Sequence, residues 1–551
     1  MSRWTVRAAS VVAAALVATS CAPTGPRHGE PVERPEPVVS EPVAPTETVV
    51  LSGGSPAALA GQSAATFFDS APLAVVATPE TAVRAGSVGV ALGVPVLTAD
   101  SGEVVSRELA RLGTETVLAV GGPDLPRGQD EVDVVEAPAD PDALADLTRL
   151  DAGTDEIAPR DAVDTLAGLD PSRPVLLDVG GSDGPGGAAG AGNSGDADPT
   201  LPATRRPDPP AGDVVVMSTG EPEQAAAVAT ARAAGAAVQV VPGGDPRASG
   251  ATVEQTAEHD PEAVVGLGRA FGDDETLSWR AQAAATGAQL PGGGQLALPG
   301  RTYVALYGSP GSPELGVLGE QGTEETISRA REVAEDYEDL TDDEVVPTLE
   351  VIATVASSAS GDDGDYSHEI PVDELRPLVE AAGESGQYVV LDLQPGRTDF
   401  LTQAQRYEEL LALPHVGLAL DPEWRLGPDE EHLEQIGHVD AAEVEEVATW
   451  LADLTREEAL PQKLFVLHAF RTSMLPDLEQ ADLDRSELAV LLHADGQGSQ
   501  SDKESTWNAL HRHAPGIAWW GWKNFLDEDS PVLSPEQTMR VAPTPHFISY
   551  Q

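Results

Sequence analysis

Two carboxylic acids separated by one residue follow an apolar segment in the last third of the chain, in the sequence Asp421-Pro422-Glu423-Trp424. Side chains two positions apart on extended backbone share a face, so we expect both carboxyl groups to point the same way. A protonated acid beside a charged one can cleave a glycosidic bond, and an indole face offers a stacking surface for a sugar ring. The sequence therefore predicts Glu423 as a general acid, Asp421 as the neighbour that tunes its pKa, and Trp424 as a substrate contact.

Further polar side chains follow other apolar segments in the same region. Asp392 is one of them, and it leaves a second arrangement open in which Asp421 is the nucleophile with Asp392 as its partner. Each of these side chains alone has a structural explanation, such as capping a turn or a helix. Lysine is rare in the chain, so Lys523 is the predicted contact for an acidic sugar or a phosphate group. The remaining predicted substrate contacts are His468, His493, Asp495, Trp520 and Trp522.

These polar positions need a fold that brings distant strand ends together. From about residue 296 apolar segments alternate with helical patterns, and the span fits a (β/α)8 barrel, in which catalytic side chains gather at the carboxyl ends of the strands. A doubly wound open sheet is the structural alternative. The predicted strands are Tyr303–Tyr307, Leu349–Val355, Tyr388–Leu393, Val416–Leu420, Leu464–His468, Leu488–His493, Ile517–Trp520 and Phe547–Tyr550.

The preceding half of the chain, 55–295, repeats a shorter pattern. Apolar segments at Leu73–Ala77, Val94–Leu97 and Val117–Val120 alternate with helical segments rich in small residues, and the pattern recurs from Val214. Continuous apolar strands separated by helices indicate parallel sheets covered on both faces. The predicted fold class is therefore α/β, with Rossmann-like repeat units followed by the barrel. Residues 180–212, dense in Gly, Asp and Pro, are predicted to be a disordered insertion.

We expect neither a cofactor nor a metal ion. The glycines at Gly121-Gly122 and Gly266-x-Gly268 follow strands, but neither forms the G-x-G-x-x-G motif of dinucleotide sites. The barrel does offer nitrogen and oxygen ligands for a divalent ion, although they come from separate strands without the local spacing of H-E-x-x-H. These side chains are His468, His493, Asp421 and Asp495.

The first repeat unit resembles the cell wall-binding repeat 2 family. In that family such repeats hold proteins non-covalently on anionic polymers of the Gram-positive wall. The resemblance implies a wall-binding role for Pro95, Val96, Leu97 and Thr98. The matching residues are Gly93 and Pro95 to Thr98, then Glu108, Leu109, Arg111, Leu112, Gly113, Val120, Gly121 and Gly122.

The barrel resembles glycoside hydrolases of the chitinase-like type, in which Asp-x-Glu ends the fourth strand. The resemblance implies that Glu423 is the general acid. The chain departs from the pattern at Ala419, where those enzymes carry a further Asp, and at Pro422.

The first residues resemble a bacterial lipoprotein signal. Arg3 and Arg7 precede a short apolar segment that is followed by Cys21, the only cysteine of the chain. The resemblance implies a signal peptide over 1–21 and lipidation of Cys21. Residues 22–54, rich in Pro, Glu and Val, are predicted to be a tether. The implied location is the outer face of the plasma membrane of a high-GC Gram-positive bacterium, within the cell wall.

The charge of the chain limits its partners. It carries 91 Asp+Glu against 32 Lys+Arg, a net charge of −59, which argues against binding to nucleic acid and disfavours binding to an anionic lipid surface. With 41% hydrophobic residues it can still bury a core. The sequence thus predicts a lipid-anchored envelope protein with wall-binding repeats and a barrel that hydrolyses a wall or extracellular polysaccharide. The alternative is a non-catalytic protein that binds polysaccharide or peptidoglycan.

Overall fold

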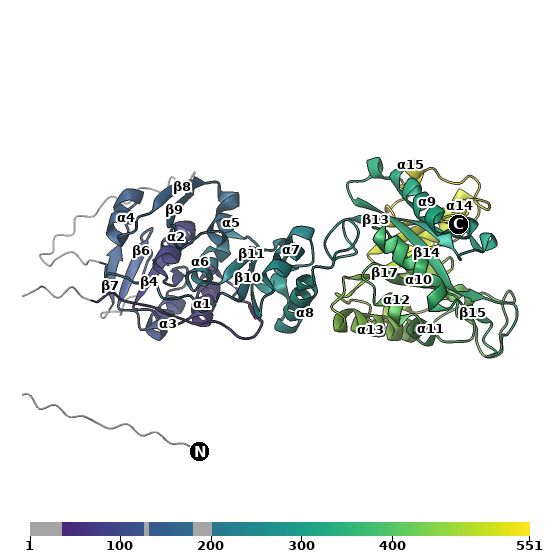
Figure 1. Ribbon diagram of the computed structural model, residues 1–551, viewed down its shortest axis with the longest axis horizontal. Coiled ribbons are helices and arrows are strands. Elements are labelled where there is room, and N and C mark those ends of the chain that lie inside the picture. Colours follow the sequence, from purple (N-terminus) through teal and green to yellow (C-terminus); the bar gives the residue numbers. More distant parts are fainter. Residues whose placement is uncertain (1–35, 126–131, 180–200) are drawn as a thin grey trace, which may run out of the picture.

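The computed structural model describes residues 36–125, 132–179 and 201–551, which form an N-terminal lobe and a C-terminal barrel (Figure 1). The predicted signal peptide and its Cys21 lie outside the described residues. Among the helices of these three ranges, none combines the length and the apolar character needed to cross a membrane.

The C-terminal part is a closed barrel of eight parallel strands, so the barrel is confirmed and the open sheet is excluded. The first strand, β13, pairs with both the second and the last strand, which closes the ring. A short strand, β15 (Ser367–Glu369), pairs antiparallel with β14. The barrel strands are β13 (Arg301–Gly308), β14 (Glu344–Ala356), β16 (Tyr388–Leu393), β17 (Val416–Leu420), β18 (Lys463–Ala469), β19 (Leu488–Ala494), β20 (Trp519–Asn524) and β21 (Phe547–Tyr550). The helices are α9 (Thr323–Glu335), α10 (Val372–Glu384), α11 (Phe400–Arg406), α12 (Glu408–Leu411), α13 (Ala441–Glu457), α14 (Gln500–His513) and α15 (Pro535–Thr538).

Strand alternation divides the barrel into two cores. Every second side chain points inward, so Tyr388 and Val390 of β16 pack inside the barrel with Leu464 and Val466 of β18. The residues between them face the surrounding helices and form the larger outer core. The next inward positions along β16 and β18, towards their carboxyl ends, are polar.

The N-terminal lobe contains the same unit three times: a strand, a 3-10 turn that begins with proline, a helix and a parallel strand. The three helices, α2 (Ala82–Leu92), α5 (Ala162–Ala167) and α6 (Ala225–Ala233), pack against one another. They meet at Gly86, where an added Cβ would lie 3.0 Å from Ala229 Cβ and 3.0 Å from Leu166 Cδ2, so a side chain there would force the helices or the Leu166 side chain to shift. The middle unit runs from β8 (Gly153–Ile157) to β9 (Val175–Val179); of its elements, the sequence pattern predicts only a strand over 174–180.

The sheets of this lobe are parallel, as predicted, with the strand orders β5-β4-β6-β7, β8-β9 and β11-β10-β12-β2. Their strands are β2 (Val49–Leu51), β4 (Leu73–Ala77), β5 (Val96–Thr98), β6 (Thr116–Val120), β7 (Asp133–Glu136), β10 (Val214–Ser218), β11 (Ala237–Val240) and β12 (Ala263–Leu267). The short strands β1 (Glu41–Pro42) and β3 (Phe68–Ser70) pair antiparallel. The other helices are α1 (Pro56–Phe67), α3 (Gly102–Leu112), α4 (Pro141–Thr148), α7 (Gly250–His259) and α8 (Asp274–Ala285).

Two segments predicted to lack structure are folded where they are described. Residues 36–54 do not form a tether, because Val49–Leu51 adds a parallel strand beside β12. The end of the predicted insertion, 201–212, is also ordered: the backbone N–H of Val38 donates to the carbonyl of Ala203 at 2.8 Å. The remainder of that insertion, 180–200, lies outside the described residues.

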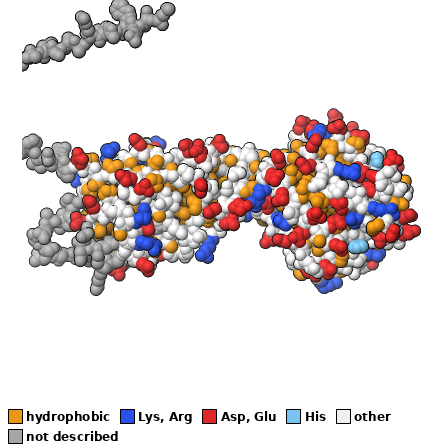
Figure 2. Space-filling model, turned by 90° about the horizontal axis from the view of Figure 1, so that it is seen from below, with side chains coloured by type: hydrophobic (Ala, Val, Ile, Leu, Met, Phe, Trp, Pro, Cys, Tyr) orange, Lys and Arg blue, Asp and Glu red, His pale blue; other side chains and the backbone are white. Residues whose placement is uncertain are grey.

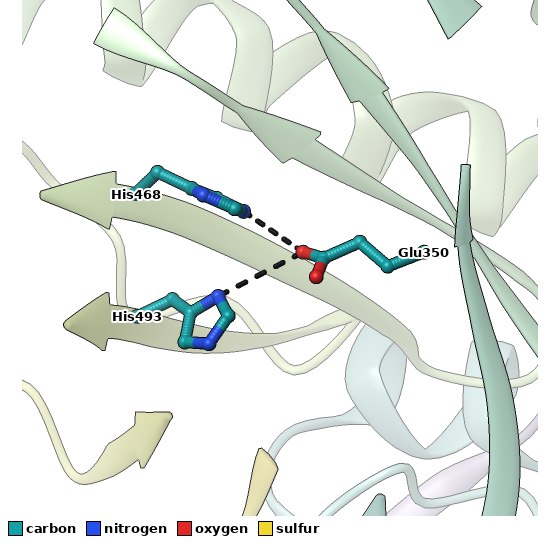
Figure 3. Close-up of side chains that lie close together, drawn as sticks. All are labelled: Glu350, His468 and His493. Atoms are coloured by element: carbon teal, nitrogen blue, oxygen red, sulfur yellow. Dashed lines mark hydrogen bonds and ion pairs between the residues drawn. The ribbon is translucent and has the colours of Figure 1, made fainter. Parts of the chain in front are cut away.

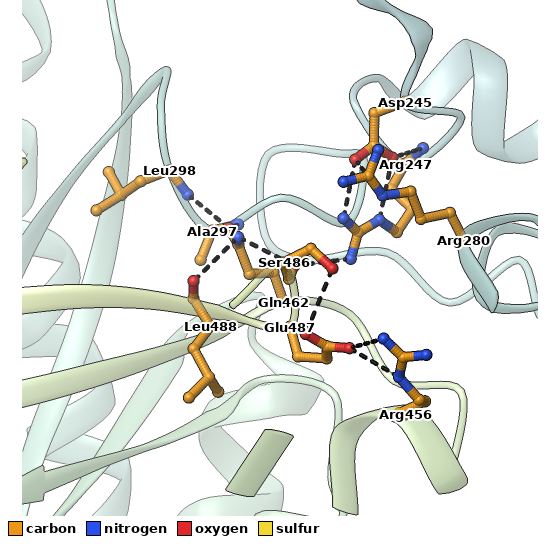
Figure 4. Close-up of polar contacts among 10 residues, drawn as sticks. All are labelled: Asp245, Arg247, Arg280, Ala297, Leu298, Arg456, Gln462, Ser486, Glu487 and Leu488. Atoms are coloured by element: carbon orange, nitrogen blue, oxygen red, sulfur yellow. Dashed lines mark hydrogen bonds and ion pairs between the residues drawn. The ribbon is translucent and has the colours of Figure 1, made fainter. Parts of the chain in front are cut away.

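The lobe and the barrel meet at the amino-terminal ends of the barrel strands (Figure 4). Arg247 is 1% exposed and pairs with Asp245 at 2.8 Å. Its guanidinium lies 4.3 Å from the Trp279 ring centroid and donates to the carbonyl of Ser486 at 3.1 Å. Because Ser486 immediately precedes β19, the carboxyl-terminal face of the barrel points away from the N-terminal lobe.

We expect Arg247→Met to loosen this junction. The substitution removes the buried donor to the Ser486 carbonyl and a cationic partner of Asp245, a loss of about 1–3 kcal/mol in the free energy of unfolding. Urea unfolding measures this loss, and limited proteolysis should show faster cleavage between residues 286 and 300. Arg160→Met is the matched control, because the Arg160 side chain is 87% exposed. Equal stability of the two variants would contradict the role of Arg247.

Acidic side chains are spread over the visible face of both parts, with few basic ones between them (Figure 2). This distribution agrees with the net charge of −59. A phosphate backbone requires clustered Lys and Arg, and this face offers none.

Candidate functional site

A layer of ionisable side chains fills the carboxyl-terminal end of the barrel interior. It continues the inward faces of the strands: Asp392 follows Tyr388 and Val390 on β16 at the same two-residue spacing, and Lys523 follows Gly521 on β20. Water is largely excluded from this layer, so charges in it interact strongly. Its buried members are Tyr307, Glu350, Asp392, Asp421, His468, His493, Asp495, Lys523 and Ser549.

His468 lies between two carboxylates. Its Nε2 is 2.8 Å from Oε1 of Glu350, and its Nδ1 is 3.0 Å from Oδ2 of Asp495. Burial alone would lower the pKa of His468, but the charges of Glu350 and Asp392 and the two hydrogen bonds raise it well above its usual range. Burial likewise opposes ionisation of Asp495, yet the hydrogen bond and charge of His468 lower the pKa of Asp495 to about 2. The result is an imidazolium held between two carboxylates.

His493 is the second histidine of this layer (Figure 3). Its Nε2 lies 3.2 Å from the hydroxyl of Ser549. Its Nδ1 faces Oε1 of Glu350 at 3.8 Å, too far for a hydrogen bond, and has no hydrogen-bond partner among the described residues. Burial lowers the pKa of His493 to about 3, so its ring is neutral.

Asp392 and Lys523 lie on either side of Tyr307. The Tyr307 hydroxyl donates to Oδ2 of Asp392 at 2.9 Å, and Nζ of Lys523 lies 3.3 Å from the Tyr307 ring centroid. Burial raises the pKa of Asp392 to about 6. Lys523 is 3% exposed, so its charge balances the buried carboxylates. The sequence had predicted that Lys523 contacts a substrate, but the side chain does not extend to the surface.

Asp421 and Glu423 do not share a face of extended backbone. Strand β17 ends at Leu420, and Pro422–Trp424 forms a 3-10 turn, so the expectation of two parallel carboxyl groups is wrong. Asp421 is 3% exposed and accepts from the backbone N–H of Glu423 at 3.2 Å, whereas Glu423 is half-buried. Proline favours the first position of a helical turn, which explains the change of direction.

Glu423 lies at the mouth of the site. It lines a cavity of about 350 Å³ together with Trp424, His432 and Arg471. Burial raises the pKa of Glu423 to about 7, and the negative charge of Asp495 adds to the effect. Burial and the charge of Asp392 raise the pKa of Asp421 well above its usual range. At neutral pH the site therefore holds Glu423 close to its pKa and an ionised Asp495.

Several predicted substrate contacts lie elsewhere. Trp520 and Trp522 point out of the barrel and pack against Trp507 of α14, with ring centroids 5.8 and 5.6 Å apart. They are 4% and 1% exposed, so stacking on a sugar is excluded. His468 and His493 are fully buried.

The predicted wall-binding residues are buried as well. Pro95 is buried and precedes β5, which contains Val96 to Thr98. The backbone of Val96 exchanges hydrogen bonds with the hydroxyl of Thr230 on α6, which joins two of the repeat units. These four residues are therefore part of the lobe interior, and their side chains do not form a polymer-binding surface.

Several residues of the site were not predicted from the sequence. Glu350 and Tyr307 are inward-facing on β14 and β13, and Ser549 is inward-facing on β21. His432 and Arg471 line the cavity from loops. The signal for the strand residues is alternation: counting in steps of two from the apolar inward positions reaches each of them.

Comparisons with known proteins give partial matches of structure. No protein-family model matches the chain, and no curated protein does. Among solved structures, Cwp6 from Clostridium difficile is similar over 63% of this chain and 63% of its own, with 13% identity and a TM-score of 0.33. A xylanase-A-amylase inhibitor protein, XAIP-III, covers 46% of this chain and 93% of its own, with 12% identity and a TM-score of 0.29. Cwp8 from Clostridium difficile covers 44% and 52%, with 14% identity and a TM-score of 0.25. Overlaps of this size carry no information about activity.

Proposed function

We propose that the barrel hydrolyses a glycosidic bond of a wall or extracellular polysaccharide, with Glu423 as the proton donor. The observation that carries the proposal is the position of Glu423, half-buried at the mouth of a cavity, with its pKa raised to about 7 by burial. A general acid works best when its pKa lies near the working pH. Glu423 is thus available to protonate the leaving oxygen at neutral pH.

The charged partner of Glu423 is Asp495. Two carboxyl groups divide into acid and anion when their surroundings move their pKa values apart, and here the values are about 7 for Glu423 and about 2 for Asp495. Asp421 and Asp392, the partners predicted from the sequence, are buried, and burial raises the pKa of both carboxyl groups. We therefore assign them to the electrostatic surroundings of Glu423, and Asp495 to stabilising positive charge on the sugar.

The sugar binds in the cavity beside Glu423. Trp424 lines this cavity, is half-buried and contacts His432 edge-on, with ring centroids 5.3 Å apart. The indole face that remains is a stacking surface for a pyranose ring. Arg471 lines the same cavity and offers a charged donor to an acidic sugar.

The pH dependence of activity reports on Glu423. Because the protonated form is the active one, kcat/KM should fall as the pH rises through about 7, the pKa of Glu423. Asp495→Asn removes a negative charge that raises this pKa, so the fall should begin at lower pH in that variant. Reducing-end assays across a pH series give both curves. Activity that stays constant up to pH 9 would exclude Glu423 as the acid.

The N-terminal lobe is proposed to bind a wall polymer, and Cys21 to carry a lipid anchor. The resemblance of the first unit to cell wall-binding repeats supports the first proposal, although the polymer would contact the lobe surface and not Pro95 to Thr98. The barrel site opens away from the lobe, so a polymer bound to the lobe leaves it accessible. The proposed location is the outer face of the plasma membrane, within the wall.

The competing function is binding of polysaccharide or peptidoglycan without cleavage. An incubation of the protein with purified wall glycan distinguishes hydrolysis from binding. Both the sedimentation of the protein and the release of reducing ends are measured. Release by the wild type and none by Glu423→Gln supports the hydrolase. Co-sedimentation of both proteins without release supports the binding protein.

A further inference from the structure

Three side chains with metal-binding atoms converge in the barrel interior: Glu350, His468 and His493 (Figure 3). All three are fully buried, and their ligand atoms lie within 4.8 Å of one another. Two metal–ligand bonds of about 2.1 Å span at most about 4.2 Å between ligand atoms. Oε1 of Glu350 lies 2.8 Å from Nε2 of His468 and 3.8 Å from Nδ1 of His493, so both separations are within this limit.

Two atoms of this group are buried without a hydrogen-bond partner. Over the described part of the chain, Nδ1 of His493 and Oε2 of Glu350 make no hydrogen bond. Unpaired polar atoms are rare in a dry interior, because nothing replaces their hydration. A cation between the neutral imidazole and the carboxylate would give Nδ1 of His493 a partner.

The surroundings of the two histidines orient them as metal ligands. Asp495 accepts from Nδ1 of His468 at 3.0 Å, which directs Nε2 towards Glu350. Ser549 contacts Nε2 of His493 at 3.2 Å, which directs Nδ1 towards the same carboxylate. A second hydrogen bond of this kind fixes the tautomer and ring orientation of nearly all metal-binding histidines.

We propose that Glu350, His468 and His493 bind a divalent transition-metal ion, with Asp495 and Ser549 orienting the two imidazoles. Two histidines and one carboxylate are the ligand set of catalytic zinc sites and of non-haem iron sites, which keep further positions open to water. The ion takes the place of the proton that His468 shares with Glu350. The two histidines are among the metal-binding side chains noted in the sequence, whereas Glu350, in the middle of β14, was not among them.

Groups around the three ligands suit a hydrated ion. Oδ1 of Asp392 and Oδ1 of Asp495 are also without a hydrogen-bond partner within the described residues. Both are acceptors for water bound to the ion. Asp495, whose pKa is lowered to about 2, adds a negative charge that attracts a cation. The proposal is independent of glycoside hydrolysis and is tested by binding alone.

The test measures Zn²⁺ binding to the full chain with Cys21→Ser, which removes its only thiol. Equilibrium dialysis of chelator-treated protein should give one ion per chain, and Co²⁺ should give visible d–d absorption in the same site. Glu350→Gln and His493→Leu should weaken binding by at least about a hundredfold, and Asp495→Asn by about ten- to a hundredfold. His438→Gln, which removes an exposed imidazole of the same domain, should leave binding unchanged.

Folding is checked by circular dichroism of each metal-free variant. His493→Leu removes a neutral ring, so it remains informative if Glu350→Gln fails to fold. Zn²⁺ should raise the melting temperature of the wild type but not that of His493→Leu. The proposal is overturned if the wild type binds no stoichiometric ion, or if folded His493→Leu binds as tightly as the wild type.

Discussion

Glu423→Gln is expected to reduce glycan hydrolysis by about 10²–10⁴-fold, the usual contribution of a general acid. Glutamine keeps the size of the side chain and its place in the cavity but cannot give a proton to the leaving oxygen. Substrate binding should change little, because the contacts of Trp424 and Arg471 are unaffected. The measurement is kcat and KM from reducing ends released from soluble wall glycan.

The matched control is Glu446→Gln on α13, an exposed glutamate outside the site. It should hydrolyse glycan at the wild-type rate. If Glu423→Gln also retains the wild-type rate, the barrel has a different acid. If only KM changes, Glu423 binds the sugar and does not transfer a proton.

His468→Leu is expected to lower the free energy of unfolding by about 3–5 kcal/mol, the cost of removing one partner from a buried ion pair. Glu350 and Asp495 would keep their places in the barrel interior without the imidazolium between them. Urea unfolding in the presence of a chelator measures the loss without any contribution from a bound ion. His438→Gln, at an exposed position, should stay within about 0.5 kcal/mol of the wild type.

The effect of His468 should depend on pH in a defined direction. Its pKa is raised in the folded state, so the stabilisation is complete below its unfolded pKa of about 6.5 and is lost as the pH rises through the folded value. The pKa of Asp495 is lowered to about 2, so the stabilisation that its carboxylate contributes is lost only in strong acid. The difference between wild type and variant should thus be large at pH 6 and smaller in alkaline solution. A pH-independent difference would indicate lost packing instead of lost charge.

The fold followed from the sequence because its strands are long, apolar and regularly spaced. Tyr388–Leu393 and Val416–Leu420 begin and end where predicted. Closure of the barrel could not be read from the pattern, because it depends on pairing between the first and last strands. The folding of 36–54 was missed although Val49–Leu51 is an apolar triplet, because the surrounding prolines dominated the composition.

Some members of the buried ionisable layer could be predicted from the sequence and others could not. The expectation of polar side chains at strand ends located Asp392, His468 and Asp495, but it missed Glu350, which lies in the middle of β14. The expectation that strand ends form the site also placed Trp522 in it. Because side chains alternate along β20, Trp522 points outward and Lys523 points inward. Charge states could not be predicted at all, because they depend on burial and on neighbours from other strands, as between His468 and Glu350.

The most direct test of the central claim is hydrolysis of purified wall glycan in water enriched in oxygen-18, followed by mass spectrometry of the soluble fragments. A glycoside hydrolase inserts solvent oxygen at each new reducing end, so the account predicts labelled fragments with the wild type and none with Glu423→Gln. The contradicting result is an absence of labelled fragments with the wild type while the protein sediments with the glycan. The barrel would then be a polysaccharide-binding domain, with Glu423 as a contact residue.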